Sequence, residues 1–320
     1  MHSPVTRVAA IHDLSGLGRT SLAVVIPILS TMGVQVCSLP TAVLSSETGA
    51  YDDFVFVDLT ESMPKFLDHW DRLGMKFDAV YSGFLGSPAQ VDLVIRCIER
   101  NLLPGGFAVV DPVLGDNGVL DPTMTMDMVE RMRHLVSRAA CITPNLTEAA
   151  FLLGETYPGD HIDAATVRDW LYRLAAMGPE MVIITSVPLV NHCVMNRCAE
   201  ETSACSASRG TGVPQAGAGC PSAVVAYQKT RGMFWQVACD YIPAFYPGTG
   251  DTFASVVTGS LLQGDSLPIA VDRAVQFVTL AIRATFGHDM PTREGVLLER
   301  VLRSLDYPMT SSTYTILEEN

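Results

Sequence analysis

The sequence predicts an α/β protein with a central, mostly parallel sheet that helices cover on both faces. Short, continuously apolar segments alternate with longer segments whose apolar residues recur every three or four positions. The first pattern is typical of parallel strands buried on both faces, and the second is typical of amphipathic helices. Polar residues gather where the apolar segments end. Because sheets of this kind bind ligands at the carboxyl ends of their strands, we expect the functional residues along that edge.

The predicted strands are the short apolar segments. Eight of them cover 8–11, 34–39, 77–81, 107–110, 140–143, 181–185, 223–228 and 232–237, and another short strand is predicted at 189–195. Residues 40–52 follow the second strand and are predicted to form a polar loop. Polar clusters that follow the first six strands would all lie at one edge of a parallel sheet.

The predicted helices are the amphipathic segments, and several begin or end at a recognisable residue. Pro88 predicts a helix start, because proline is favoured in the first turn, while Gly33 and Gly264 are each expected to end a helix. One helix follows Gly18 and runs to about residue 32. The others are predicted at 63–73, 88–101, 125–137, from 144 onward, and at 167–177, 251–262, 269–285 and 293–304.

We expect residues 1–320 to form a single domain with a flexible insert at 196–222. A domain of 320 residues lies within the range of large α/β folds, and no linker or internal repeat divides the sequence. The insert is dominated by Ser, Ala, Gly and Cys and has no hydrophobic period. Its Gly210-Thr211-Gly212 imitates a motif at 248–250, but no acid follows it.

Composition argues against several classes of partner. A net charge of −13 disfavours nucleic acid and anionic membranes, which bind basic surfaces, although it allows a phosphorylated ligand held by local positive potential. No apolar run reaches membrane-spanning length, and the first residues lack a basic region followed by an apolar one. The eight cysteines contain no CxxC pair. We therefore expect a soluble, cytoplasmic protein.

The most informative motif is a glycine turn that runs into a helix and carries an acid. In Gly248-Thr249-Gly250-Asp251 the glycines precede an amphipathic segment, so they lie where helix N–H groups and the helix dipole attract an anion. Asp251 would repel a resting phosphate, but it could take a proton from a hydroxyl that attacks the phosphate. A glycine turn with a capping aspartate explains these four residues equally well.

Oxygen-bearing side chains follow two other predicted strands at the same edge. Asp111 and Asp116 follow the strand at 107–110, and Asn145 and Glu148 follow the strand at 140–143. Such ligands suit Mg²⁺ that is held partly through water and partly by phosphates. Taken alone, Asn145 and Glu148 are better explained as a helix capping box. Their expected position beside the glycine turn favours the metal site.

Other motifs are incomplete or missing. Gly16-Leu17-Gly18 suggests a dinucleotide-binding turn, but Ser21 stands where the third glycine is required, and no acid ends the second strand. The absence of GKS or GKT excludes a P-loop. The sequence also lacks GxSxG, which disfavours a nucleophile-elbow hydrolase. The seven histidines have no zinc-binding spacing.

Four motifs together resemble the pyridoxal kinase branch of the ribokinase-like superfamily, and they are most similar to bacterial pyridoxamine kinases. The motifs are Tyr-Ser-Gly-Phe-Leu-Gly at 81–86, Asp-Pro-Val-x-Gly-Asp at 111–116, Thr-Pro-Asn-x-x-Glu at 143–148 and Gly-Thr-Gly-Asp at 248–251. The resemblance extends from about residue 8 to residue 302, apart from the insert. It implies a three-layer α/β/α ribokinase-like fold, ATP-dependent transfer to a hydroxymethyl group, and a homodimer.

The resemblance also implies a role for each site residue. Asp251 would be the catalytic base, and Gly248, Thr249 and Gly250 would form the anion hole. Asp111, Asp116, Asn145 and Glu148 would organise Mg²⁺ and ATP, with Thr185 and Ser186 along the nucleotide. Asp111 and Thr143 would border a monovalent cation such as K⁺, so the implied metal-site residues are Asp111, Glu148 and Thr143. Asp13, Ser15, Thr48 and Phe84 would line the pocket for a B6 vitamer.

The pocket departs from the better-known pyridoxal kinases at three positions. Asp13 stands where they have a serine against the pyridine nitrogen, Glu47 replaces a histidine, and Phe84 replaces a tyrosine. A carboxylate near the ring nitrogen favours the protonated ring. We therefore expect Asp13 to influence which vitamer is preferred.

Three other functions stay open at this point. A hydroxymethylpyrimidine kinase shares the chemistry and differs only in the pocket. A nucleotide-binding sensor without catalysis is disfavoured by the intact Asp251. A sugar kinase is disfavoured by Phe84 and Leu85, which suit an aromatic ligand.

Overall fold

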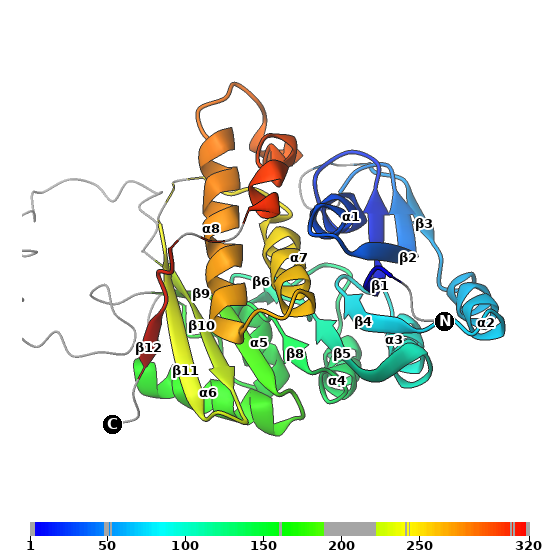
Figure 1. The fold of residues 1–320 in the computed structure, drawn as a ribbon, viewed down its shortest axis with the longest axis horizontal. Helices are drawn as coiled ribbons and strands as arrows, with labels where there is room; N and C mark the ends of the chain where they lie inside the picture. The colour runs from blue at the N-terminus through cyan, green and yellow to red at the C-terminus, as the bar shows by residue number, and fades with distance from the viewer. Residues whose placement is uncertain are drawn as a thin grey trace, which may run out of the picture.

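A sheet of ten strands runs through the centre of the molecule, with helices on both faces (Figure 1). The computed structural model describes residues 4–47, 51, 53–159, 162–188, 222–240, 242, 244–307, 309 and 311–317. The strand order is β12-β11-β10-β9-β8-β5-β4-β1-β2-β3. The fold is the predicted three-layer α/β/α arrangement with a mostly parallel sheet.

The middle of the sheet is parallel and its two edges are antiparallel. The parallel strands are β1 (Arg7–Ser15), β2 (Gln35–Leu44), β4 (Phe77–Ser82), β5 (Leu102–Val110), β8 (Cys141–Ile142) and β9 (Met181–Pro188). The antiparallel strands are β3 (Phe56–Asp58) at one edge and β10 (Ser222–Gln228), β11 (Met233–Cys239) and β12 (Thr315–Leu317) at the other. A separate hairpin joins β6 (Gly115–Asp116) to β7 (Val119–Leu120).

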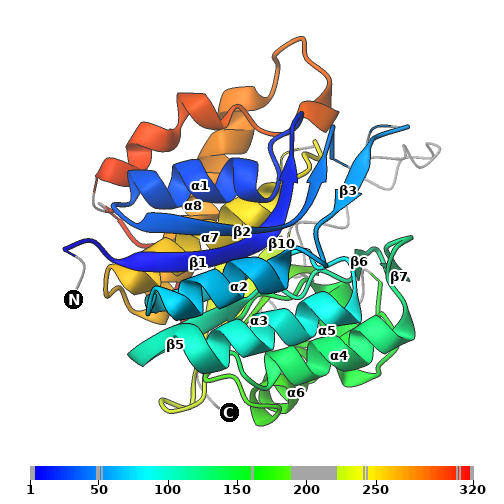
Figure 2. The same cartoon turned by 90° about the vertical axis from the view of Figure 1, so that its right-hand side faces the viewer.

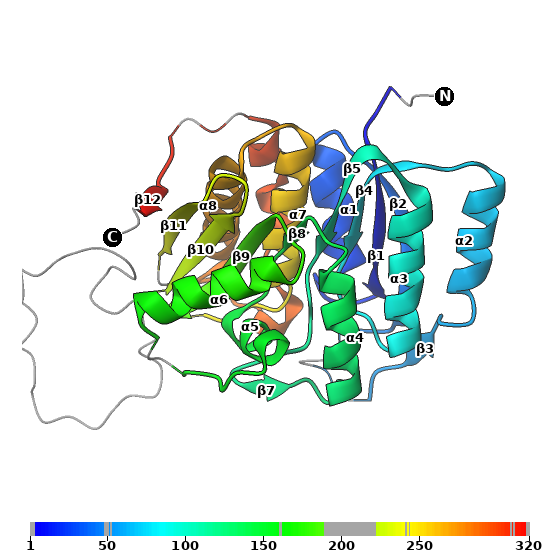
Figure 3. The ribbon, with the colours of Figure 1, turned by 90° about the horizontal axis from the view of Figure 1, so that it is seen from below.

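The helices divide between the two faces of the sheet. Figure 2 shows α1 on one side of β1 and β2, with α2 and α3 on the other, and Figure 3 shows α3 to α6 in front of the sheet. One layer holds α1 (Leu22–Thr31), α7 (Thr249–Leu262) and α8 (Leu267–Thr285). The other holds α2 (Met63–Arg72), α3 (Pro88–Asn101), α4 (Met126–Val136), α5 (Leu146–Leu153) and α6 (Ala164–Ala176). No helix in the described ranges is long and apolar enough to cross a membrane.

Each face of the sheet has its own apolar core, which explains why the strands are apolar throughout. In β1, Ala9 and Ile11 belong to the core under α2 to α6, whereas Val8 and Ala10 belong to the core under α1, α7 and α8. All four side chains are fully buried. The alternation follows from the two-residue period of a strand. The two cores hold the strand ends, and thus the predicted functional edge, in fixed positions.

Two sequence predictions differ from the structure, and four short strands were not predicted. Residues 40–52 were predicted as a loop, but residues 40–44 extend strand β2. The pairing of β2 with β1 becomes irregular beyond Pro40, because proline has no N–H to donate. Residues 293–304 were predicted as one helix, but they form three short 3-10 turns: η1 (Thr292–Glu294), η2 (Leu298–Arg300) and η3 (Leu302–Asp306). Gly295 has a positive φ of 77°, which interrupts a helix. Strands β3, β6, β7 and β12 were not predicted. The predicted strand at 189–195 and nearly all of the insert lie outside the described residues, whereas Ser222 begins β10.

Candidate active site

The glycine turn lies at the start of α7, as predicted. Gly248 is the N-cap of this helix and has a φ of 77°, a conformation that favours glycine. A Cβ at this position would lie 1.9 Å from the carbonyl oxygen of Arg19, so no side chain fits there. A Cβ at Gly250 would meet no atom within 4 Å. The first turn of α7 therefore presents its N–H groups beside open space, which suits an anion.

Asp251 lies in the first turn of α7 and is partly buried. Its Oδ2 accepts a hydrogen bond of 2.8 Å from the backbone N–H of Ser21, which precedes α1. Burial, together with the negative charges of Asp111 and Asp13, raises the pKa of Asp251 to about 7, although the Ser21 hydrogen bond opposes the rise. A carboxyl group with this pKa can exchange a proton near neutral pH, as a general base requires.

Asp13 forms a buried hydrogen-bonded group near the end of β1. Its Oδ1 accepts a bond of 2.5 Å from the hydroxyl of Ser21, and its Oδ2 accepts a longer bond of 3.4 Å from the hydroxyl of Ser15. Burial raises the pKa of Asp13, and the charge of Glu47 adds to the effect, while the serine hydrogen bonds oppose it. The predicted residues Asp13 and Ser15 are thus in contact, and Ser21 connects them to Asp251.

Asp111 and Thr143 follow neighbouring strands, and the structure brings them together. The hydroxyl of Thr143 donates to Oδ1 of Asp111 over 2.9 Å, and both side chains are buried. Burial raises the pKa of Asp111 to about 7. Apart from this hydroxyl, no side chain in the described part of the chain donates a hydrogen bond to the carboxylate of Asp111 or forms an ion pair with it. A cation at this position would stabilise its charged form.

Asn145 and Glu148 form a complete capping box at the start of α5. The Asn145 side chain accepts from the Glu148 N–H over 2.9 Å, and the Glu148 carboxylate accepts from the Asn145 N–H over 2.7 Å. Glu148 also accepts from the N–H of Leu114 over 3.2 Å. Burial raises the pKa of Glu148 well above its usual range, and the charge of Asp111 adds to the effect. Asn145 and Glu148 are therefore a helix capping box, as their sequence alone suggested. The Glu148 carboxylate is also close enough to Asp111 to be affected by its charge.

Asp116 lies at the rim of this group rather than within it. It begins the turn of the β6–β7 hairpin, is exposed, and accepts a bond of 2.9 Å from the N–H of Asn117. The hairpin is tied to α5, because the Asn145 side chain donates to the Gly115 carbonyl over 3.0 Å. Within the described ranges, no three His, Cys, Asp or Glu side chains converge as a ready-made metal site. A cation here would need ligands from a bound molecule or water.

Thr185 and Ser186 lie in β9 beside the capping box. Residues Asn145 and Thr185 form a parallel bridge, and the Thr185 N–H donates to the Pro144 carbonyl over 2.9 Å. Ser186 is exposed and has a positive φ of 58°, where the pairing of β9 with β10 is irregular. In the sheet, β9 lies beside β8 on the side away from β4 and β1, so Thr185 and Ser186 border the Asp111–Glu148 group on that side.

The two remaining pocket predictions have different outcomes. Phe84 is partly buried, and its carbonyl oxygen accepts a bond of 3.3 Å from Thr41. Thr48 lies outside the described residues.

Sequence reasoning missed Ser21 and Tyr81. A serine before an apolar helix ordinarily signals an N-cap, so Ser21 gave no sign of contacting Asp251. Tyr81 is fully buried in β4, and burial together with the charges of Asp111 and Asp251 raises its pKa well above 10.0. Its hydroxyl is therefore a neutral group close to both acids.

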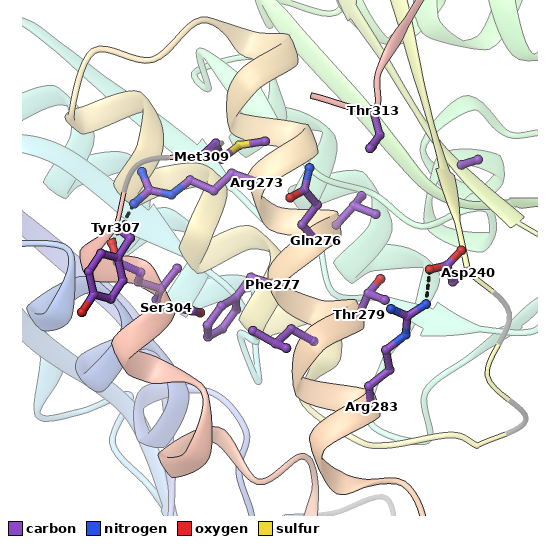
Figure 4. Close-up of a pocket in the computed structure, with 14 residues that line it drawn as sticks. Asp240, Arg273, Gln276, Phe277, Thr279, Arg283, Ser304, Tyr307, Met309 and Thr313 are labelled. Carbon is purple, nitrogen blue, oxygen red and sulfur yellow. Dashed lines mark hydrogen bonds and ion pairs between the residues drawn. The ribbon is translucent and has the colours of Figure 1, made fainter. Parts of the chain in front are cut away.

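A separate cavity of about 610 Å³ lies along α8 (Figure 4). Phe277 and Leu280 of α8 contribute apolar surface, and Arg283 forms an ion pair of 2.6 Å with Asp240 at one end. None of the predicted site residues lines this cavity.

Comparisons with known proteins agree with this fold. A family model described as phosphomethylpyrimidine kinase matches residues 26–240 and 222–294. The structure superposes with a TM-score of 0.86 on a candidate phosphomethylpyrimidine kinase of Bacteroides thetaiotaomicron crystallised with pyridoxal, which is 48% identical over 98% of this chain and 100% of that one. The TM-score is 0.77 with pyridoxal kinase from Lactobacillus plantarum, 30% identical over 95% of this chain and 97% of that one.

A curated relative is named for activity on pyrimidines and not for activity on pyridoxal. The hydroxymethylpyrimidine/phosphomethylpyrimidine kinase of Bacillus subtilis is 28% identical over 66% of this chain. The match spans 65% of that relative's length, slightly less than two thirds.

Gly248→Ala should destabilise the protein more than a matched change at Gly264. Both glycines have positive φ, 77° and 90°, so each alanine variant carries a backbone cost of about 1–2 kcal/mol. Only at position 248 would the Cβ also strike a backbone carbonyl, whereas at Gly264 nothing lies within 4 Å. We expect an additional loss of about 2 kcal/mol or more in the free energy of unfolding, measured with urea. Equal losses would contradict the close contact.

Asp111→Asn should stabilise the metal-free protein in a pH-dependent way. In the unfolded chain Asp111 loses its proton near pH 3.8, but in the folded chain it keeps the proton up to about pH 7. The contribution of Asp111 to stability is therefore complete below pH 3.8 and is lost as pH rises toward 7. We expect Asp111→Asn to raise the free energy of unfolding at pH 8 by about 2–4 kcal/mol, and by less at pH 5.

Urea unfolding in the presence of a chelator measures this difference. Asp289→Asn, a change at an exposed position, is the control and should alter stability little at either pH. A gain for Asp111→Asn that is the same at both pH values would argue against the raised pKa.

Proposed function

The chain belongs to the phosphomethylpyrimidine kinase family, and on that premise we propose that it phosphorylates the hydroxymethyl group of a B6 vitamer with ATP. Its kinase fold is that of the ribokinase-like pyridoxal kinases. The observation that carries the proposal is the position of Asp251. A carboxyl group with a pKa of about 7 stands in the first turn of α7, beside a glycine turn suited to an anion. These are the two parts that phosphoryl transfer to a hydroxyl requires.

In the proposed reaction Asp251 acts as the general base. The hydroxymethyl oxygen attacks the γ-phosphorus of ATP, its proton passes to Asp251, and ADP leaves. The N–H groups of Gly248, Thr249 and Gly250 stabilise the charge on the transferring phosphoryl group, because they point from the positive end of α7. The Ser21 N–H holds Oδ2 of Asp251, so Oδ1 is the atom left for the substrate.

The buried acids suit a divalent cation that arrives with ATP. Asp111 and Glu148 are buried, and in the described residues no ion pair neutralises either carboxylate. We propose that they hold Mg²⁺ together with the triphosphate, with Asp116 at the rim, and that Thr185 and Ser186 lie along the nucleotide. Bound Mg²⁺ would neutralise phosphate charge. Asp111 and Thr143 are also the candidates for a monovalent cation such as K⁺.

The substrate pocket is acidic, which supports a ligand with a basic ring. Asp13 and Glu47 are both buried and close enough for the charge of Glu47 to raise the pKa of Asp13. A protonated pyridine nitrogen would relieve this repulsion. The Bacteroides relative was crystallised with pyridoxal, which favours the same substrate class. The alternative is hydroxymethylpyrimidine, which the family description and the Bacillus relative favour. We also propose a cytoplasmic homodimer, on the family resemblance.

A substrate panel tests this proposal. Purified protein with Mg-ATP is given pyridoxal, pyridoxamine, pyridoxine, hydroxymethylpyrimidine or ribose, and kcat/KM is measured for each. A B6 vitamer should have the highest value. A higher value for hydroxymethylpyrimidine would favour the alternative, and no turnover of any compound would favour a non-catalytic sensor.

Asp251→Asn should lower kcat by about 100-fold or more while ATP still binds, because the variant keeps the shape of the side chain and removes the base. In the wild type, kcat/KM should rise with pH through about 7 as Asp251 loses its proton. The variant should lose this dependence. Turnover retained by the variant would exclude Asp251 as the base.

Asp13→Ser should change the ranking of the three vitamers. Removal of this carboxylate removes a group that favours a protonated ring, so kcat/KM should fall most for the vitamer that binds in that form. Glu47→Gln, which removes a neighbouring charge but leaves Asp13, is the comparison. An unchanged ranking in Asp13→Ser would contradict the proposed contact.

A further inference from the structure

Ser21 has a backbone conformation that is unfavourable for serine. Its φ of 50° and ψ of −132° lie in a region that suits glycine, and the side chain is buried. Such a conformation costs about 1–3 kcal/mol and persists only where surrounding contacts enforce it. Ser21 is the N-cap of α1, yet its hydroxyl makes no capping bond to that helix. Its carbonyl oxygen accepts from the N–H groups of Val24 and Val25 in α1, whereas its hydroxyl and its own N–H bind groups outside the helix.

The two donors of Ser21 bind two different carboxylates. The hydroxyl donates to Oδ1 of Asp13 over 2.5 Å, and the backbone N–H donates to Oδ2 of Asp251 over 2.8 Å. Asp13 belongs to β1 and Asp251 to α7, so a single residue bridges the vitamer side and the phosphoryl side of the site. In the described residues, no ion pair involves either carboxylate.

The other groups that face these two acids are acidic or neutral. The negative charge of Asp111, which follows β5, raises the pKa of Asp251, and the charge of Glu47 raises the pKa of Asp13. The charge of Asp251 in turn raises the pKa of Tyr81 in β4, so that hydroxyl is neutral. The remaining donor to Asp13 is Ser15, at the longer distance of 3.4 Å. In the described residues, the shortest hydrogen bond to each of the two carboxylates therefore comes from Ser21.

We propose that Ser21 is a positioning residue that couples Asp13 in the substrate pocket to the base Asp251 through the chain Asp13–Ser21–Asp251. The proposal rests on the proposed function for the role of Asp251 as base and for the place of Asp13 in the substrate pocket. The hydroxyl bond to Asp13 holds Ser21 in its unfavourable conformation, and that conformation aims the N–H at Oδ2. A substrate that changes the hydrogen bonding of Asp13 therefore changes how firmly Asp251 is held.

Titration of Asp251 in the free protein tests the coupling without any substrate. The carboxyl ¹³C signal of Asp251, assigned by its loss in Asp251→Asn, is followed against pH in the wild type, Ser21→Gly, Asp13→Asn and the double variant. Glycine suits the backbone at position 21 and keeps the N–H while removing the hydroxyl. Ser62→Gly is the control, because Ser62 is also an N-cap without a capping bond and lies at the start of α2.

The two single variants should move the pKa of Asp251 in opposite directions. Asp13→Asn removes a negative charge that raises this pKa, so the pKa should fall. In Ser21→Gly the hydroxyl no longer fixes the backbone, so the N–H hydrogen bond that lowers the pKa of Asp251 weakens and the pKa should rise. We expect shifts of about half a pKa unit or more, and no further shift in the double variant than in Asp13→Asn. Additive shifts, or no shift in Ser21→Gly, would overturn the coupling.

Kinetics with the substrate found by the panel provide the second readout. Ser21→Gly should lower kcat about tenfold with KM for ATP unchanged, and by less than about threefold in the Asp13→Asn background. Equal losses in both backgrounds would also overturn the proposal. If Ser21→Gly does not fold, Ser21→Ala removes the same hydroxyl and the same criteria apply. If the wild type turns over no compound, the proposed function fails, while the titration still decides the coupling.

Discussion

The close approach of Gly248 to the carbonyl oxygen of Arg19 is the constraint on which the site depends. This contact leaves no room for a Cβ, and it presses the loop after β1 against the first turn of α7. Two residues beyond Arg19, the N–H of Ser21 is then in reach of Asp251. Farther along α7, a Cβ at Gly259 would lie 2.5 Å from the sulfur of Met32, so the α1–α7 layer is tight at both ends. Two glycines thus set the position of the proposed base.

The site concentrates negative charge that its own residues do not neutralise. Burial raises the pKa of Asp111 and Asp251 to about 7 and also raises that of Asp13 and Glu148. Such an arrangement is costly for an empty protein, because buried carboxylates lose hydration. It becomes favourable when cations and protonated groups enter with the ligands. The same electrostatics that weaken the free fold would strengthen binding, and this follows from the placement of each acid at a strand end or a helix start.

The sequence was sufficient to predict the fold and the edge of the sheet where the polar residues gather, because periodicity and strand-end clusters are local patterns. The motifs at 111–116, 143–148 and 248–251 also identified residues that the structure brings near one another. The contact of Ser21 with Asp251 could not be predicted, because it depends on a backbone conformation that serine seldom adopts. Tyr81 belongs to a predicted strand and to the motif at 81–86, but no role in the site was predicted for it. The short turns after residue 291 and the edge strands β3 and β12 were missed because tertiary contacts outweigh their weak local patterns.

The hydrogen bond between Ser21 and Asp251 joins residues that are 230 positions apart. During synthesis on the ribosome, β1 and its acid are exposed long before the helix that completes the site exists. Asp13 on β1 and Asp111 after β5 therefore stay hydrated and lack their final neighbours until most of the chain has emerged. Long-range closure of this kind is slow because the entropy of the intervening chain is lost before the contact forms. Catalytic competence would thus be among the last properties that a nascent chain acquires.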